Sequence, residues 1–450
     1  MERFCAEDYV MEHITDYRDM SFEKLCEVVG VKFRKRWQEE RDDFIGAMLL
    51  QKKAIIGYEK EVGYLIDKID EFIKSKNYFS VPYPSWYESL AEGIYHENWG
   101  MAGMAEWFGE RFRNSSSAKI IGNDIFYLDR GKMKLMEQKI SKDRREQLIR
   151  GFLLLTPQER MDRDFHEIYL LDGTRITIFK GKMVKQDREV IIFRRYIIPE
   201  YSFKQQESFG TIPKGSGILF EYMVKAGFNV AFTGPVRSAK TSFLSTWQRY
   251  EDPELEGVMV ETDPEIRLHE IMPFSPIVQI IADNEKLKNI SKNLLRSDAD
   301  YFILAEARDG IALDTAIRIA SKGTRRMKMT FHTRDPLDFP YDVASEIVKS
   351  MGGDIAITSK KVAASIDYIF HFVQLADKSK KRLKCIYELL YDKSEDAIKM
   401  QEICRYNFRS DNWRFSYLIS EEKKRLAEEE NYKAFHSFDL QLKKMSERKQ

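Results

Sequence analysis

The sequence is short of cysteine, of long apolar runs and of net charge. Its 450 residues include four cysteines, none of them in a C-x-x-C pair, which argues against a disulfide framework and against a zinc knuckle. No apolar run approaches the roughly 18 residues that are needed to cross a bilayer. The formal net charge is +1, so neutralising nucleic-acid phosphates is not expected to be the main task of the chain.

The N-terminus and the composition indicate a cytosolic globular protein. The opening MERFCAEDYVMEH is acidic where a signal peptide is basic and then apolar. Charged residues make up 32% of the chain and apolar residues 43%, and the length suggests two or three domains. From changes in composition we expect a helical N-terminal region, an α+β domain, a nucleotide-binding α/β domain and a helical C-terminal extension, over residues 1–112, 113–206, 207–420 and 421–450.

Both ends of the chain have helical patterns. In the first 110 residues apolar positions recur at three- and four-residue spacing, as in Phe44–Leu65. Within them Lys32–Trp37 is a basic cluster with interleaved aromatic residues, which could touch anionic lipid or nucleic acid. It runs directly into acidic residues, so a solvated helix with internal ion pairs explains it without a partner. Beyond residue 420 the chain is rich in Lys and Glu, and we expect a solvated helix.

The polar stretch Asn114–Ser117 introduces short β-type runs. We expect strands at 118–121, 124–128, 168–171, 174–179 and 190–195, with a helix over 143–155. The last strand contains Arg194 and Arg195, whose side chains must point to opposite faces of the strand. One of them could face a neighbouring subunit, and an exposed edge pair explains them equally well.

A strand, a phosphate-sized turn and a helix follow one another over Phe228–Arg249. The turn reads Gly234-Pro235-Val236-Arg237-Ser238-Ala239-Lys240-Thr241, which is the G-x-x-x-x-G-K-[ST] pattern with alanine in place of the second glycine. In such a loop backbone N–H groups and the helix N-terminus surround a phosphate, the lysine reaches the β- and γ-phosphates, and the threonine binds Mg²⁺. We therefore expect residues 234–242, through Ser242, to bind ATP with Thr241 on Mg²⁺. The alternative is an ordinary βα turn that happens to contain Lys-Thr.

Two buried strand patterns end in carboxylates, GVMVE at Glu261 and YFILAE at Glu306. Open α/β sheets bind ligands at the carboxyl ends of their strands, so we expect both carboxylates to converge on whatever Lys240 holds. One of them can orient or deprotonate an attacking water, and the other can hold the Mg²⁺ shell. A third strand pattern, MKMTF, ends in His332, and we expect the other histidines to have structural or surface roles.

In this order the motifs resemble one protein family. The phosphate loop, V-E-T-D-P-E-I-R-L, F-I-L-A-E-A-R-D-G and M-T-F-H-T are similar to the type II/IV secretion ATPases, specifically the CpaF/TadA branch with VirB-like motors. The resemblance covers about residues 118–418. Within it, Asp172–Arg175 resembles the motif D-G-S-R and Phe193–Tyr196 resembles I-R-K-F. It implies a RecA-like P-loop ATPase domain, preceded by a small α+β domain and a helical region.

The resemblance also implies roles for the residues at the strand ends. Glu261 is similar to the catalytic glutamate, and Glu265 to the second acid of the same motif. Glu306 takes the Walker B position, which binds Mg²⁺, and Arg308 takes that of the arginine that follows it. His332 is similar to the histidine of the His box.

The same resemblance implies an assembly and a task. Arg194 is similar to an arginine that reaches a nucleotide across a subunit boundary. The family forms hexameric rings that hydrolyse Mg-ATP at the cytoplasmic face of the membrane. A homo-hexamer is therefore expected, held peripherally at the membrane by a polytopic inner-membrane platform protein, with no specific nucleic acid. It would power pilus assembly, protein secretion or conjugative transfer.

The sequence departs from the family pattern in several places. Ala239 replaces the loop glycine, Pro235 and Val236 replace small residues, Ala305 replaces a glycine, and Gly323–Arg325 lacks the usual histidine. A strained backbone at the alanine costs on the order of 1–3 kcal/mol, so we expect slow but real hydrolysis. The alternatives are a degenerate nucleotide-binding scaffold with little turnover and a nucleic-acid translocase on a RecA-like fold.

Overall fold

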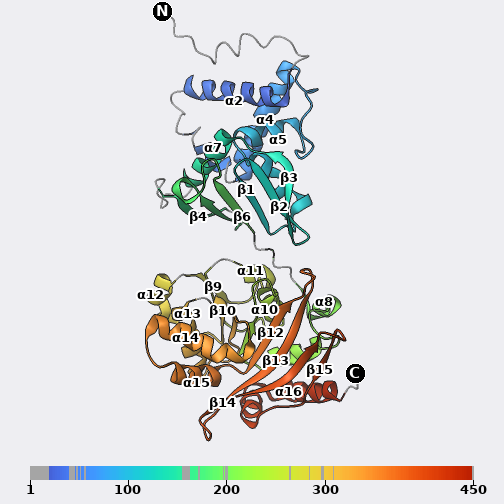
Figure 1. The fold of residues 1–450 in the computed structure, drawn as a ribbon, viewed down its shortest axis with the longest axis vertical. Coiled ribbons are helices and arrows are strands. Elements are labelled where there is room, and N and C mark those ends of the chain that lie inside the picture. The colour runs from blue at the N-terminus through green and yellow to red at the C-terminus, as the bar shows by residue number, and fades with distance from the viewer. Residues whose placement is uncertain are drawn as a thin grey trace, which may run out of the picture. The chain divides into compact units, whose positions relative to one another are not determined.

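The chain divides into two compact units, residues 1–197 and 198–450, and each is described by itself (Figure 1). The computed structural model describes residues 20–39, 46, 49–50, 52–54, 57–154, 163–170, 173–195, 197, 201–262, 265–282, 284–294, 298–307 and 309–447.

The first unit has helices at its start and between its strands. They are α2 (Phe22–Glu39), α4 (Glu59–Lys76), α5 (Leu90–Asn98), α6 (Ala105–Phe108) and α7 (Lys142–Leu154), with the short turns η3 (Ala102–Met104), η4 (Glu110–Phe112) and η5 (Gly181–Met183). On α4 the apolar residues Leu65, Ile69 and Phe72 recur at helical spacing and are buried. They belong to the same hydrophobic core as the strands of this unit. The predicted helical N-terminal region is confirmed in the part that the structure describes.

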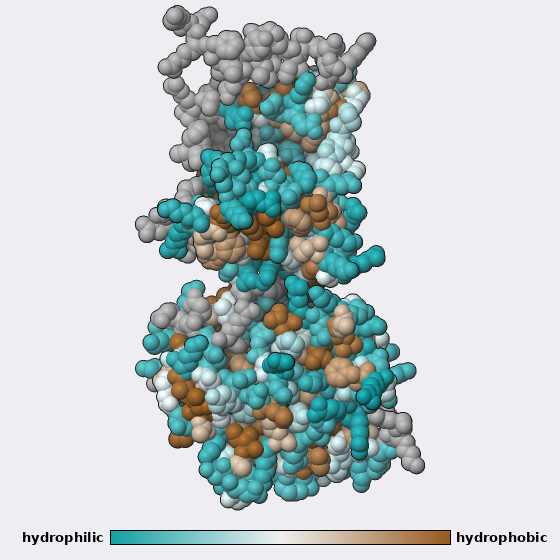
Figure 2. All heavy atoms as spheres, in the orientation of Figure 1, coloured by the Kyte–Doolittle hydropathy of each residue, from teal (hydrophilic) through white to brown (hydrophobic). Residues whose placement is uncertain are grey.

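An antiparallel sheet completes the first unit, with the strand order β3-β2-β1-β6-β5-β4. The strands are β1 (Ser117–Ile121), β2 (Asp124–Asp129), β3 (Lys132–Lys139), β4 (Phe165–Tyr169), β5 (Arg175–Phe179) and β6 (Val190–Arg194). Buried and less buried residues alternate, as in β6, where Ile191 and Phe193 face the core and Arg194 is exposed. Brown, apolar residues show on the surface in this part of the unit (Figure 2). The sequence did not predict β3, which pairs with β2 through a turn with positive φ at Arg130 and Gly131.

The second unit contains a nine-stranded sheet in the order β15-β14-β13-β12-β7-β11-β10-β8-β9. The strands are β7 (Val230–Thr233), β8 (Gly257–Glu261), β9 (Ile277–Ile281), β10 (Tyr301–Ala307), β11 (Lys328–Phe331), β12 (Tyr368–Gln374), β13 (Lys381–Asp392), β14 (Ala397–Asn407) and β15 (Asn412–Phe415). From β12 to β9 all neighbours are parallel, and β13 to β15 extend the sheet by antiparallel pairing. This mixed α/β arrangement is the predicted RecA-like fold, with the loop-bearing strand β7 in the interior of the sheet.

Helices cover both faces of this sheet. They are α8 (Phe203–Ser208), α9 (Gly217–Lys225), α10 (Lys240–Gln248), α11 (Leu268–Ile271), α12 (Asn284–Leu294), α13 (Gly310–Ser321), α14 (Phe339–Met351), α15 (Ile355–Ser365) and α16 (Glu421–Ser446), with the turn η6 (Pro336–Asp338). Figure 1 shows α13, α14 and α15 grouped together. Strand β7 is fully buried: Phe232 packs with α10 in one core cluster, while Ala231 belongs to the cluster of α13 and α14.

The C-terminal helix α16 differs from the solvated extension that we expected. Phe435, Phe438 and Leu442 on one face are buried in a core cluster of the second unit. The Lys423 ammonium lies 2.8 Å from the buried Asp367 carboxylate. The Lys/Glu-rich composition describes only the outer face, and periodic apolar residues give the helix a packed inner face. Among the described helices, none is long and apolar enough to cross a membrane.

Candidate nucleotide-binding site

The predicted phosphate loop joins the end of β7 to the start of α10. Gly234 has φ 139°, and a Cβ at this position would lie 2.2 Å from the carbonyl oxygen of Phe372 on β12, so only glycine fits. Arg237 and Ala239 also have positive φ, 64° and 78°. The alanine thus adopts the left-handed conformation that the usual glycine would adopt without strain.

The lysine of the loop lies within the site. Lys240 is the first residue of α10 and is 5% exposed. Its ammonium donates to the carbonyl oxygen of Pro235 at 2.8 Å and lies 3.2 Å from Nδ1 of His332. The structure therefore brings together the loop and the end of β11, which are 92 residues apart in the chain.

The rest of the loop fits an anionic group. Ser238 is 1% exposed, and its hydroxyl has no hydrogen-bond partner among the residues that the structure describes, which leaves it able to bind an anionic group. Pro235 and Val236 are exposed, while Thr241 and Ser242 are half-buried in the first turn of α10. Backbone N–H groups at a helix start, a buried lysine and a buried hydroxyl are suited to phosphate.

The two predicted carboxylates stand at the ends of neighbouring strands. Glu261 ends β8 and pairs in register with Ala305 of β10, directly before Glu306. One oxygen of the Glu261 carboxylate accepts hydrogen bonds from the backbone N–H groups of Glu265 and Ile266, at 3.0 and 3.2 Å. These bonds fix the orientation of the carboxylate.

Glu306 has an unusual backbone conformation. Its φ is 56°, and the register between β10 and β11 shifts at this point. Its backbone N–H donates to the Thr330 hydroxyl at 2.7 Å, and the residue is 8% exposed. Among the described residues no group of three or more His, Cys, Asp or Glu could hold a metal. A Mg²⁺ ion beside Glu306 would take oxygen ligands from a nucleotide and water, which is its usual preference.

The remaining predicted site residues are Arg308 and Arg194. Arg308 lies outside the described residues, as do Asp172 and Tyr196. Arg194 belongs to the first unit, where it is exposed at the end of β6. Arg195 points to the other side of the strand, with its guanidinium 3.7 Å from the centroid of the Trp107 ring. The expectation of opposite faces is thus confirmed, and the action of Arg194 on a neighbour stays a prediction.

The structure adds a residue to which the sequence analysis gave no role in the site. His371 on β12 is paired in register with Thr233, the last residue before the loop, and its Nδ1 lies 3.0 Å from the Thr233 hydroxyl oxygen. Burial, together with the charge of Lys384, lowers the pKa of His371 to about 4. A histidine within the apolar run YIFHFV was the available signal, but sequence alone does not show which strand lies beside β12.

Comparisons with known proteins find distant similarity. No protein-family model matches the chain. Competence protein ComGA of Bacillus subtilis is 24% identical over 225 residues, which cover 46% of this chain and 59% of ComGA. The uncharacterized protein MJ1287 of Methanocaldococcus jannaschii is 25% identical over 206 residues, covering 44% of this chain and 71% of that protein. The match thus spans a little over half the length of ComGA.

Solved structures of low identity also align with the chain. The VirB11 ATPase of the Brucella suis type IV secretion system has a TM-score of 0.35 at 14% identity, covering 63% of this chain and 92% of that chain. The pilus retraction motor PilT with bound ADP has a TM-score of 0.45 at 13% identity, covering 72% and 86%. The ATPase DotB of Yersinia pseudotuberculosis has a TM-score of 0.46 at 14% identity, covering 81% and 89%. The function proposed below therefore rests on the site residues and on the sequence motifs.

Proposed function

We propose that this chain is a motor ATPase that hydrolyses Mg-ATP. The observation that carries the proposal is the loop of residues 234–241, with glycine where a Cβ cannot fit and Lys240 reaching His332. Glu261 and Glu306 add two carboxylates at adjacent strand ends. Positioning of the phosphates and neutralisation of their charge supply most of the barrier reduction in phosphoryl transfer.

The roles of the side chains follow from their chemistry. Lys240 would meet the terminal phosphates, and the Ser238 hydroxyl and the loop N–H groups would bind phosphate oxygens. Thr241 and Glu306 would hold Mg²⁺, which would neutralise the developing charge. Glu261 would orient and activate the attacking water, because its carboxylate is already held by two backbone donors. His332 would contact the phosphate end of the site through its place beside Lys240.

The test is a comparison of wild type with Lys240→Ala. We expect this substitution to abolish nucleotide binding or nearly so, because it removes the charge that meets the phosphates. Binding is measured by titration of a fluorescent ATP analogue, and turnover by phosphate release. Undiminished ATP affinity in Lys240→Ala would mean that the loop is an ordinary βα turn.

The assembly belongs to the proposal as well. Based on the motif resemblance, we propose a homo-hexamer at the cytoplasmic face of the membrane, held there by a polytopic platform protein and powering a pilus, secretion or conjugation apparatus. Arg194 would act on the nucleotide of a neighbouring subunit, as arginines supplied in trans commonly do. Mixtures of Arg194→Ala and Lys240→Ala subunits should regain activity, because some pairs combine an intact loop with an intact arginine. Activity no higher than that of either variant alone contradicts a shared site.

One observation favours a second candidate, a nucleotide-binding scaffold with little turnover. Ala239 adopts φ 78°, which is unfavourable for alanine, at the point where the backbone would come close to a phosphate. Turnover of the assembled wild type above the Lys240→Ala background separates the two candidates, since a scaffold would bind nucleotide and show none.

A further inference from the structure

The strand order of the second unit indicates which way a nucleotide runs from the phosphate loop. On one side of β7 lie β11, β10 and β8, and the last two of these carry Glu306 and Glu261 at their carboxyl ends. If these carboxylates act on the terminal phosphate, that end of the nucleotide lies on the β11 side of the loop. The base then leaves on the opposite side, toward β12 and β13.

An exposed aromatic pair lies on that side of the loop. Tyr201 and Phe209 flank the short helix α8, and their ring centroids are 4.9 Å apart with the ring planes at 68°. Such an edge-to-face contact is favourable and holds the two rings in a defined arrangement. Phe209 is nevertheless 52% exposed, so about half of its surface is available to a ligand.

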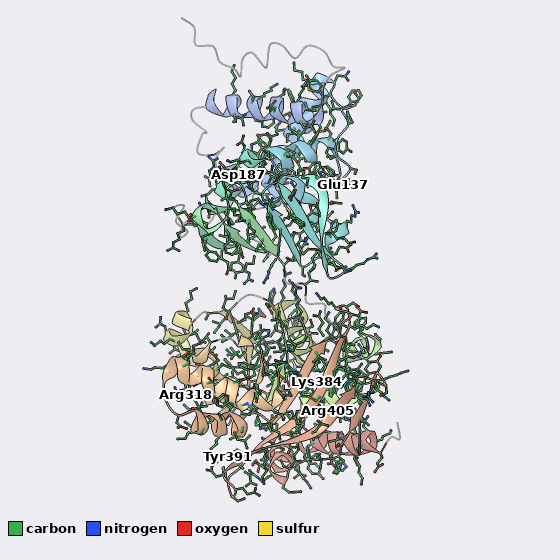
Figure 3. All side chains as sticks on the ribbon, in the orientation of Figure 1. Glu137, Asp187, Arg318, Lys384, Tyr391 and Arg405 are labelled. Carbon is green, nitrogen blue, oxygen red and sulfur yellow. The ribbon has the colours of Figure 1, made fainter. Side chains whose placement is uncertain are left out.

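A continuous set of contacts connects the segment after this pair to the loop. The carbonyl oxygen of Thr211 accepts a hydrogen bond from the backbone N–H of Leu383 on β13, at 2.7 Å. Leu383 is paired in register with Phe372 on β12, whose carbonyl oxygen lies against Gly234; Lys384, the next residue of β13, is labelled in Figure 3. Neighbouring strands are about 4.8 Å apart, which places Thr211 three spacings, or about 14 Å, from β7. A ribose and base that extend from a phosphate in the loop, and a phenyl ring that extends to meet them, together cover this separation.

The segment that bears Phe209 is held firmly against β13. The buried Arg382 donates to the carbonyl oxygen of Phe209 at 3.4 Å and pairs with Asp411 at 3.1 Å. Gly210 has φ 65°, and a Cβ there would lie 3.3 Å from the same guanidinium. A ring on a segment that is already fixed loses little freedom when a ligand binds, which favours affinity.

Positive charge follows the same path from the loop. Arg237 is an exposed residue of the loop, and Lys381 is the first residue of β13. Burial lowers the pKa of Lys381, Asp377 raises it, and the charge of Arg237 lowers it, so the two cations are close enough to interact. Cations at these positions suit a phosphate chain that runs from the loop toward β13.

We propose that Phe209 stacks on the base of the nucleotide whose phosphates occupy the loop, and that Tyr201 holds the Phe209 ring in place. This inference rests on the proposed nucleotide site and names the residues that bind the other end of the same ligand. Stacking on an aromatic ring is a common way for proteins to bind a base, because every base has a π face.

Binding of ADP and of inorganic pyrophosphate separates the two ends of the site, because pyrophosphate has no base and ATP hydrolysis consumes neither ligand. In calorimetric titrations we expect Phe209→Ala to weaken ADP binding by at least about fivefold and to leave pyrophosphate affinity within about twofold. The matched control is Phe274→Ala, which removes a 96% exposed phenylalanine before β9 and should change neither affinity. Unchanged ADP affinity in Phe209→Ala, or an equal loss for pyrophosphate, overturns the inference.

Two further variants test stacking itself. Phe209→Trp keeps an aromatic face, so ADP affinity should stay within about threefold of wild type. ADP, but not pyrophosphate, should then change the indole fluorescence beyond the change seen in wild type. Phe209→Leu keeps apolar bulk without a π face and should bind ADP about as weakly as Phe209→Ala. Wild-type ADP affinity in Phe209→Leu would contradict stacking.

Lys240→Ala distinguishes failure of this inference from failure of the proposed function. If the loop binds phosphate, Lys240→Ala loses both ADP and pyrophosphate. Retention of both ligands in Lys240→Ala defeats the nucleotide site and the base contact together. Loss of both in Lys240→Ala, with full ADP affinity in Phe209→Ala, defeats the base contact alone.

Discussion

The Ala239→Gly substitution tests the energetics of the phosphate loop most directly. In the structure Ala239 adopts φ 78° and ψ 21°, a left-handed conformation that costs an L-residue about 1–2 kcal/mol and glycine almost nothing. The Ala239→Gly variant also loses about 0.4–1 kcal/mol more in conformational entropy on folding than wild type does. The difference predicts a rise in the free energy of unfolding of up to about 1.5 kcal/mol.

The structure also shows where this cost arises. The left-handed conformation belongs to the folded loop, so the cost is borne mainly on folding. We therefore expect Ala239→Gly to tighten nucleotide binding by at most about fivefold, which corresponds to about 1 kcal/mol. If the whole cost of 1–3 kcal/mol fell on binding, the affinity could change by up to roughly a hundredfold. The expected change in affinity is smaller than that. Turnover should rise within the same modest range.

Urea unfolding of wild type and variant measures the effect on stability. The matched control is Ala316→Gly in the middle of α13, where glycine should lower the free energy of unfolding by about 1 kcal/mol or more. Opposite signs for the two substitutions support the reasoning. Equal destabilisation by both would refute the left-handed strain at Ala239, and absence of hydrolysis in both wild type and Ala239→Gly would favour the scaffold.

Three further predictions concern the Glu261 carboxylate and two buried groups. Glu261→Gln keeps the shape but removes the charge, so nucleotide binding should persist while phosphate release falls by a few orders of magnitude; equal loss of both would make Glu261 a structural residue. Lys328→Ala removes one of the two cations that hold the buried Glu251 carboxylate, the ammonium at 2.5 Å, while Arg326 stays on its other oxygen. The free energy of unfolding should fall by about 1–3 kcal/mol in urea titrations. A loss below about 1 kcal/mol would contradict a buried pair. His371 has a pKa of about 4 against an ordinary 6.5, so the unfolded chain takes up a proton that the native chain does not. The neutral native ring therefore contributes about 3 kcal/mol to the free energy of unfolding above pH 6.5, and this contribution is lost as the pH falls toward 4. In unfolding measured between pH 7.5 and 4.5, the stability of His371→Gln should depend less on pH than that of wild type.

The loop and the strand ends could be predicted from the sequence because their signals are local. Strand β7, the turn and helix α10 follow one another in the chain, and an apolar run, a glycine and a Lys-Thr pair identify them without reference to distant residues. The carboxylates Glu261 and Glu306 could be placed at one edge because parallel strands end on the same side of a sheet. The fold class followed from the same alternation of strands and helices.

What only the tertiary structure decided depends on which distant segments become neighbours. Strand β12 lies beside β7, and this order places His371 against Thr233 across 138 residues of chain. The burial of one face of α16 likewise depends on the surface that receives it, which its Lys- and Glu-rich composition does not reveal. The conformation of Ala239 is also decided by the tertiary structure, because the surrounding loop holds φ at 78° against the preference of alanine. Sheet order and packing choose among conformations and partners that the local sequence leaves open, because the energy of a long-range contact exists only once both segments are in place.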